Sequence, residues 1–165
     1  MTQAMLPCLP QSDDDSACLL HTYAIVDCAH LDGLFYLEIQ KDPNIVSRSL
    51  LADTPHEKSA IAGPLLILVV PHNTGLAQML LPIEAENPAV VWLWSALPFD
   101  EIHPRLQMLQ FGERRNGQKF FLRYFDPRNL EAMLPIFLAD KEGRLALSLI
   151  QGWAYRRDGQ YRYLT

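Results

Sequence analysis

The sequence predicts an α/β domain with a central mixed β-sheet, helices flanking that sheet and a C-terminal β-hairpin. Two compact apolar runs, at 64–70 and 89–97, are typical of strands that are covered on both faces. Segments with apolar residues at helical spacing alternate with such runs, as in domains that pack helices on a sheet. Near the C-terminus an Asp-Gly pair lies between two β-prone segments, which is a strong hairpin signal.

The chain has 165 residues, a length that suits one domain. Residues 1–20 are rich in Pro and Asp, so we expect a flexible N-terminal arm followed by a single domain over 21–165. The β-prone run at 21–28 predicts the first strand. Residues 31–42 predict either a short helix or a turn with a strand, and residues 47–63 are expected to be irregular.

The middle of the chain predicts two further helices. Residues 72–86 carry an apolar stripe at i, i+3, i+4 and i+7, the spacing of a helix that lies on a sheet. A second helical pattern covers 98–113, and Pro104 is expected in its first turn, where a missing N–H does little harm. Asn116-Gly117 then marks a turn, and the aromatic run at 118–125 predicts a strand.

A helix is expected to begin at Asp126-Pro127-Arg128. The Asp126 carboxylate can cap this helix by accepting from backbone N–H groups two or three residues later. Pro127 suits the first helical position, because its fixed φ fits there and its missing donor costs nothing. Arg128 has no such local explanation, since a cation in the first turn opposes the helix dipole. The apolar stripe of the helix consists of Leu130, Met133, Leu134, Phe137 and Leu138.

The chain closes with a hairpin over 152–164, in which Asp158-Gly159 predicts a type I′ turn. A two-residue loop places Arg156 opposite Tyr161 and Tyr155 opposite Arg162. Such cross-strand pairs can stack a cation on a ring.

Composition narrows the class of protein. Charged residues make up 20% and the formal net charge is −5, which argues against a nucleic-acid partner because a basic stripe is absent. The longest apolar run is far too short to span a bilayer, so no membrane contact is expected. The N-terminal residues lack a basic signal-peptide start, and the odd number of cysteines favours free thiols. We therefore expect a cytoplasmic protein.

One catalytic hypothesis can be built from Ser95, His103 and Asp126, which lie near the ends of expected elements. Acyl transfer needs a nucleophile, a base within hydrogen-bond reach and a carboxylate that orients the base. Ser95 follows Trp-Leu-Trp without the G-x-S-x-G elbow, and Asp126 already has a capping role. A small-molecule-binding or hydrolytic α/β domain stays open as the alternative function. It predicts that these three side chains meet in a deep polar pocket.

Cofactor and metal signals are weak. The 5 histidines show no zinc-site spacing, and the one close pair, Cys28 and His30, has no second pair to complete a site. No Gly-rich phosphate loop occurs. We expect no cofactor, no metal and no enzymatic activity, which favours a binding or scaffolding role.

Several local patterns together resemble the adaptor/chaperone family that loads toxic effectors onto the type VI secretion spike. They occur in the family's order over about residues 22–165. The most specific is "LRYFDPRNLEAMLP", an aromatic run that ends in Asp-Pro-Arg. The other stretches are "YAIVDCA", "AGPLLILVV", "WSALPFDEIHPRLQML" and "IQGWAYRRDGQY".

The resemblance implies a non-enzymatic cytoplasmic chaperone that binds a secreted toxin effector and hands it to the VgrG spike protein. It also implies that the motif residues define the fold, and a shared surface, rather than catalysis. Carried over by position, these residues are Asp27, Gly63, Pro64, Ser95, His103, Arg105, Asp126, Pro127, Arg128 and Trp153.

The chain departs from the family pattern in two places. Pro104 stands where a Leu is usual, and the chain stops after the hairpin, so it resembles a short version without the C-terminal lobe of many members. A module that acts only as an oligomer is a further, weaker option.

The arginines suggest an ionic network. We expect Asp27 or Asp126 to pair with Arg105 or Arg128 inside the fold, in preference to direct partner contact. Tyr and Arg are favoured interface anchors. The candidate partner contacts are Arg128, Tyr155, Tyr161 and Tyr163.

Overall fold

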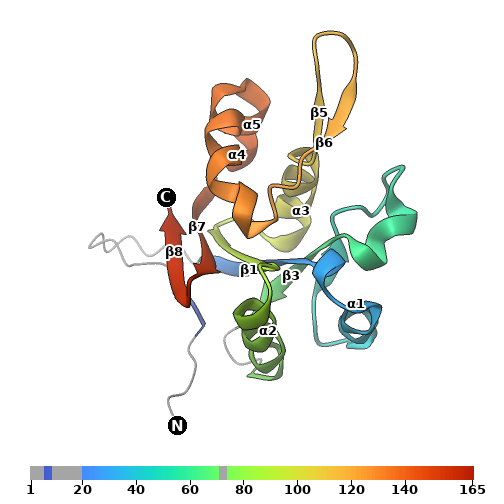
Figure 1. Ribbon diagram of the computed structural model, residues 1–165, viewed down its shortest axis with the longest axis vertical. Coiled ribbons are helices and arrows are strands. Elements are labelled where there is room, and N and C mark those ends of the chain that lie inside the picture. Colours follow the sequence, from blue (N-terminus) through green and yellow to red (C-terminus); the bar gives the residue numbers. More distant parts are fainter. Residues whose placement is uncertain (1–5, 9–19, 71–73) are drawn as a thin grey trace.

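The computed structural model describes residues 6–8, 20–70 and 74–165. It shows an α/β fold in which a six-stranded sheet, in the order β2-β3-β1-β4-β7-β8, carries helices on both faces (Figure 1). The strands of this sheet are β1 (His21–Asp27), β2 (Ser47–Ser49), β3 (Pro64–Val69), β4 (Val90–Ser95), β7 (Ile150–Arg157) and β8 (Gln160–Leu164). The helices are η1 (Cys28–His30), α1 (Gly33–Lys41), η2 (Glu57–Ala62), α2 (Thr74–Glu86), α3 (Phe99–Met108), α4 (Pro127–Ala139) and α5 (Lys141–Leu147).

The direction of the strands corrects one part of the expected fold. All neighbouring strands of the sheet pair antiparallel, so the sheet is antiparallel rather than mixed. The strand–helix–strand unit β3-α2-β4 does exist, but β1 lies between β3 and β4 and pairs antiparallel with both. β3 and β4 therefore run parallel to each other, as the alternation of strands and helices suggests, but they are not neighbours because β1 lies between them.

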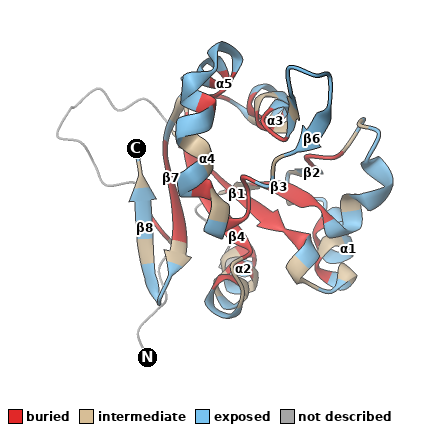
Figure 2. Ribbon diagram, turned by 45° about the horizontal axis from the view of Figure 1, so that its top comes forward, coloured by how far each residue is buried: buried red, intermediate tan, exposed pale blue. Residues whose placement is uncertain are grey.

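Two apolar cores cover the two faces of the sheet. Alternate β1 residues serve each one: Tyr23 and Ile25 pack on the side of α3, α4 and α5, whereas Ala24 and Val26 pack on the side of α1 and α2. Figure 2 shows the buried strands between these two helical layers. Burial of each large apolar side chain contributes about 1.5–3 kcal/mol, so the apolar residues of β3 and of β4 up to Trp94 stabilise both cores.

The region before α4 differs from the sequence prediction. The expected strand at 118–125 is only β6 (Lys119–Phe121), which pairs with β5 (Phe111–Glu113) in a separate hairpin. Tyr124 and Phe125 are both buried, and consecutive strand residues would have pointed to opposite faces. The chain turns at this point so that both rings enter one core, and Tyr124 Oη donates to the Leu106 carbonyl at 2.8 Å.

The start of α4 follows the local prediction. Asp126 Oδ1 accepts from the backbone N–H of Arg128 at 3.0 Å, and Pro127 is the first helical residue. Within the expected apolar stripe, Leu130 and Phe137 are buried, whereas Leu138 is exposed. The sequence did not predict the separate helix α5, which Asp140 caps.

The C-terminal hairpin confirms the expected register. Asp158 and Gly159 have φ values of 52° and 77°, which fit a type I′ turn. Arg156 pairs with Tyr161 and Tyr155 pairs with Arg162.

The expectation for Pro104 is wrong, because it lies inside α3, which begins at Phe99. The structure describes the expected N-terminal arm only at residues 6–8 and 20, and the remainder lies outside the described residues. Leu6 packs against the core between the sheet and helices α1 and α2. Among the residues that the structure describes, no helix is long and apolar enough to cross a membrane.

Candidate functional site

Two buried carboxylates, Asp27 and Asp126, lie where β1 ends and α4 begins. We call this site the carboxylate–arginine cluster, formed by Asp27, His30, Arg123, Asp126 and Arg128. Asp27 is the last residue of β1, and its Oδ1 accepts from the backbone N–H of Ala29 at 3.2 Å, which caps η1. The two carboxylates therefore occupy positions that the backbone fixes.

Each buried carboxylate of the cluster faces an arginine. Arg123 Nη2 donates to Asp27 Oδ2 at 2.6 Å. Arg128 makes a forked contact with Asp126, from Nε to Oδ1 at 2.9 Å and from Nη2 to Oδ2 at 2.7 Å. The carboxylate side chains are 1% and 4% exposed, whereas the arginine side chains are 43% and 60% exposed. Desolvated acids are thus neutralised by cations that keep contact with solvent.

The electrostatics of Asp126 reflect this arrangement. Burial alone would raise the pKa of its carboxyl, but the hydrogen bonds from the side chain and backbone of Arg128 hold the pKa below its ordinary value. Asp126 is therefore ionised at neutral pH, as its capping and ion-pair roles require.

Asp27, His30 and Asp126 also offer ligand atoms within 4.8 Å of one another, a spacing that a metal ion could use. The charges argue for a different role. Two guanidinium groups already neutralise the two carboxylates, and Arg128 Nη2 lies 3.4 Å from His30 Nε2. A cation would have to displace these contacts, so the cluster as it stands is a charge-balanced structural network.

Gly63 and Pro64 lie beside Asp27. Pro64 pairs with Asp27 across the sheet, and the Gly63 carbonyl accepts from the N–H of Cys28 at 3.1 Å. A Cβ on Gly63 would lie 2.5 Å from a methyl carbon of Leu51, so a larger residue would need that side chain to move. These motif residues, distant in sequence, thus build one end of the sheet.

Ser95, His103 and Asp126 do not form a hydrogen-bonded triad. Ser95 Oγ donates to the Leu149 carbonyl at 2.7 Å, and His103 Nε2 bonds the Ser49 carbonyl at 2.9 Å. Asp126 bonds Arg128. Burial lowers the pKa of His103, although the bond to Ser49 opposes that shift, so its ring is neutral at pH 7. Each side chain ties down a separate part of the fold.

Two other motif residues also have structural contacts. Arg105 Nη1 donates to the Leu145 carbonyl at 2.9 Å and so links α3 to α5. The expected pairing of Asp126 with Arg128 is confirmed, whereas Asp27 pairs with Arg123. Trp153 is buried and meets Tyr124 edge-on, with ring centroids 6.2 Å apart.

The candidate partner contacts occupy different environments. Tyr155 is only 2% exposed and its hydroxyl donates to Glu131, so it offers little accessible surface. The Tyr161 hydroxyl donates to the buried carboxylate of Glu84, whereas Tyr163 remains 39% exposed. Arg128 and Tyr155 line a cavity of about 370 Å³ between α4, α2 and the C-terminal hairpin.

Sequence reasoning missed Arg123, His30 and Glu84. Arg123 was placed on an expected strand, and its partner Asp27 is 96 positions away, so no local pattern joined them. Glu84 follows the apolar stripe of α2 and bonds Trp92 Nε1 at 2.8 Å as well as Tyr161. For Arg123, the one sequence signal is its position three residues before Asp126, the residue that caps α4.

Residues 22–143 match a family model described as "Domain of unknown function (DUF4123)". The chain belongs to this DUF4123 family. No curated protein and no solved structure matches the chain. The DUF4123 match includes every residue of the carboxylate–arginine cluster and all the motif residues except Trp153. The C-terminal hairpin β7–β8 lies beyond the matched DUF4123 residues.

Proposed function

We propose that this DUF4123 protein is a non-enzymatic cytoplasmic adaptor that binds a toxin effector of the type VI secretion system. In this role it acts as a chaperone for the toxin and helps to load it onto the VgrG spike protein. The sequence patterns that resemble the adaptor family occur in order along the chain, and the family match covers residues 22–143.

One observation carries the proposal: the polar motif side chains are engaged inside the fold. Asp27 and Asp126 are bound by arginines, and Ser95, His103 and Arg105 each bond a backbone carbonyl. Side chains with such hydrogen bonds fix the positions of the backbone and the helices. In a catalytic site, by contrast, a nucleophile, a base and an orienting acid would bond one another. The motif therefore supports a scaffold whose work is done by its surface.

The surface of this scaffold suits protein contact. Large apolar side chains are exposed on the β5–β6 hairpin and on α4 and α5, among them Phe120, Ile136 and Leu145. Clustered apolar exposure of this kind marks surfaces that bind other proteins. The charge of −5 favours partners that present cationic groups.

Co-expression tests the proposal. The tagged chain is produced together with the toxin and the spike protein encoded beside it, and the purified material is weighed by native mass spectrometry. We expect a defined complex with that toxin and none with a toxin from an unrelated gene cluster. A chain that stays free under these conditions would contradict the proposal. So would hydrolytic turnover by the pure chain that a Ser95→Ala change abolishes.

A further inference from the structure

A second concave surface, lined by none of the motif residues, lies between the β5–β6 hairpin and the turn that joins α4 to α5. This hairpin groove has a volume of about 430 Å³, within the range of roughly 300–1,000 Å³ typical of ligand pockets. Its walls include Met108, Phe111, Phe120 and Ile136, which are 41%, 39%, 37% and 54% exposed. The Phe111 ring packs on His56 and Phe121, on the hairpin face opposite to Phe120, so Met108, Phe120 and Ile136 provide the exposed apolar side chains of the hollow.

The hairpin presents its rings because it stands outside the main sheet (Figure 1). A lone two-stranded hairpin is marginally stable and buries little of its surface. Phe120 lies over Gly112, where an added Cβ would come 2.4 Å from the ring, so the absence of a side chain at 112 lets the ring lie flat there. The groove wall is therefore built by the hairpin's own sequence.

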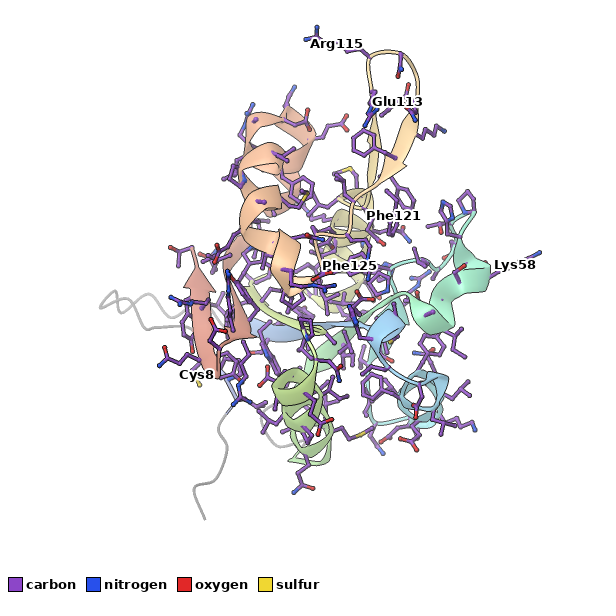
Figure 3. All side chains as sticks on the ribbon, viewed as in Figure 1. Cys8, Lys58, Glu113, Arg115, Phe121 and Phe125 are labelled. Carbon is purple, nitrogen blue, oxygen red and sulfur yellow. The ribbon has the colours of Figure 1, made fainter. Side chains whose placement is uncertain are left out.

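Acidic residues border these apolar walls. Glu113 comes from the hairpin (Figure 3), and Asp140 and Glu142 come from the N-terminal end of α5. Hydrogen bonding from the backbone N–H of Gly143 lowers the pKa of Asp140, so its carboxylate is charged at neutral pH. None of the described residues that line the groove is a lysine or arginine. On the hairpin side, Arg114 Cζ lies 5.9 Å from the centroid of the Phe120 ring, and Lys119 pairs with Glu113 across the hairpin. The groove is thus apolar at its centre, and its negative edge is the side formed by Asp140 and Glu142.

This charge pattern selects among possible occupants. In a two-fold dimer through the groove, the same patch of both copies would meet, so Asp140 and Glu142 of each would face the like charges of the other. Like charges across an interface are costly. A different segment, with apolar side chains for the hollow and cations for the edge, satisfies both features.

We propose that the hairpin groove binds an amphipathic segment of the toxin that carries leucine-like side chains on one face and Lys or Arg beside them. The inference rests on the adaptor function proposed above and names the surface and the chemistry of recognition. The segment binds as a helix in a groove: apolar anchors enter between the hairpin and α4, and its cations meet the carboxylates of Asp140 and Glu142.

A defined probe tests the groove without the toxin. It is a fluorescent helical peptide of about 15 residues, with Leu on one face and Lys beside it, added to the full chain. We expect saturable binding by fluorescence anisotropy that weakens as salt rises. A second peptide with Glu in place of Lys should bind weakly or not at all. Equal binding of the two peptides, or binding of neither, would overturn the inference.

Matched variants locate the binding. Ile136→Glu should weaken binding about tenfold or more, because it puts a carboxylate in the apolar hollow. Leu34→Glu adds the same charge at a 63% exposed site on α1, and it should change affinity by less than about twofold. Glu142→Lys should weaken binding and Glu38→Lys, also on α1, should weaken it less. Equal losses of affinity within either pair of variants would show that net charge causes the effect, and would contradict binding in the groove.

The toxin separates this inference from the proposed function. If the wild type and Ile136→Glu capture the toxin equally well, the hairpin groove is not the binding site, and the proposed adaptor function is unaffected. If wild type captures no toxin, the proposed function fails, and the peptide titration alone decides the groove. Self-association in sedimentation that Ile136→Glu abolishes would show that a second copy occupies the groove, which also overturns the inference. Thermal melting of each variant checks that it is folded.

Discussion

The carboxylate–arginine cluster and the hairpin groove handle polar and apolar groups in opposite ways. In the cluster, each buried carboxylate forms an ion pair with an arginine of the same chain. Around the groove, apolar rings remain exposed and the acidic edge has no cation among the described lining residues. This contrast is what the proposed function expects if the cluster serves stability and the groove serves recognition.

The motif residues fall on one side of this division. None of them is among the described residues that line the hairpin groove. On the proposed function, the motif residues would mark the scaffold, and partner choice would depend on residues outside the motif. The predictions below ask whether stability and binding divide in the same way.

Within the carboxylate–arginine cluster, the largest loss of stability is expected for Asp27→Asn. This change removes the charge that Arg123 binds, and hydrogen bonds to charged groups contribute roughly 1.5–3 kcal/mol, so we expect a loss of about 2 kcal/mol in unfolding free energy. Urea denaturation measures it. Asp53→Asn is the matched control, since Asp53 also pairs with an arginine, Arg48, but is 74% exposed. A surface pair contributes at most about 1 kcal/mol, so equal losses for the two variants would contradict a structural role for the cluster.

Asp126→Ala comes next, with an expected loss of about 1–2 kcal/mol, because it removes the cap of α4. Its pH dependence follows from the lowered pKa of Asp126. The folded pKa is below the unfolded value of about 3.9, so the stabilisation is complete above that pH and disappears as pH falls through the folded pKa. The difference between wild type and Asp126→Ala should be constant from neutral pH to about 5 and should shrink below about 4.

Thermal melts across this pH range provide the measurement. His103 supplies an internal comparison, because burial lowers its folded pKa below the unfolded value of about 6.5. Its contribution is complete above that pH and falls as the solution becomes more acidic, so His103 affects a higher window than Asp126. An Asp126→Ala difference that already shrinks near pH 6 would mean that another group controls the α4 cap.

Asp126 also shows which parts of the structure the sequence could predict. Its cap, Pro127 and the register of the Asp158-Gly159 hairpin depend on neighbours within a few residues, and all were predicted. The Asp27–Arg123 pair joins residues 96 positions apart and depends on β1 lying in the middle of the sheet. Local patterns carry no information on that order, and they led to the expectations of a mixed sheet and a long strand at 118–125.

Arg128→Ala should have a smaller effect on stability than Asp126→Ala. The change removes the forked contact, but the side chain is largely exposed and the Asp126 carboxylate keeps its bond to the backbone N–H at position 128. We expect a lower melting temperature and unchanged capture of the toxin. Arg128→Lys should restore part of the stability, because one donor remains. Lost capture with an unchanged melting temperature would place Arg128 in the partner interface instead.

The smallest effect on stability is expected in the hairpin groove, where binding should change most. Phe120→Ser removes a ring that is 37% exposed on a hairpin outside the main sheet, so unfolding free energy should change by no more than about 0.5 kcal/mol. Affinity for the Leu/Lys peptide should fall nonetheless. Phe125→Ser is the contrast, because that ring is 2% exposed in the core, and loss of a buried aromatic typically costs about 3–5 kcal/mol.

The two phenylalanines lie five positions apart in the sequence, and the expected outcomes differ. Phe120→Ser should weaken peptide binding with little change in stability, whereas Phe125→Ser should mainly lower stability. Urea denaturation and peptide anisotropy on both variants give the four values needed. If Phe120→Ser destabilises the fold as much as Phe125→Ser does, the hairpin is part of the core. Its exposed rings would then report packing, and the separation of scaffold from recognition surface would not hold.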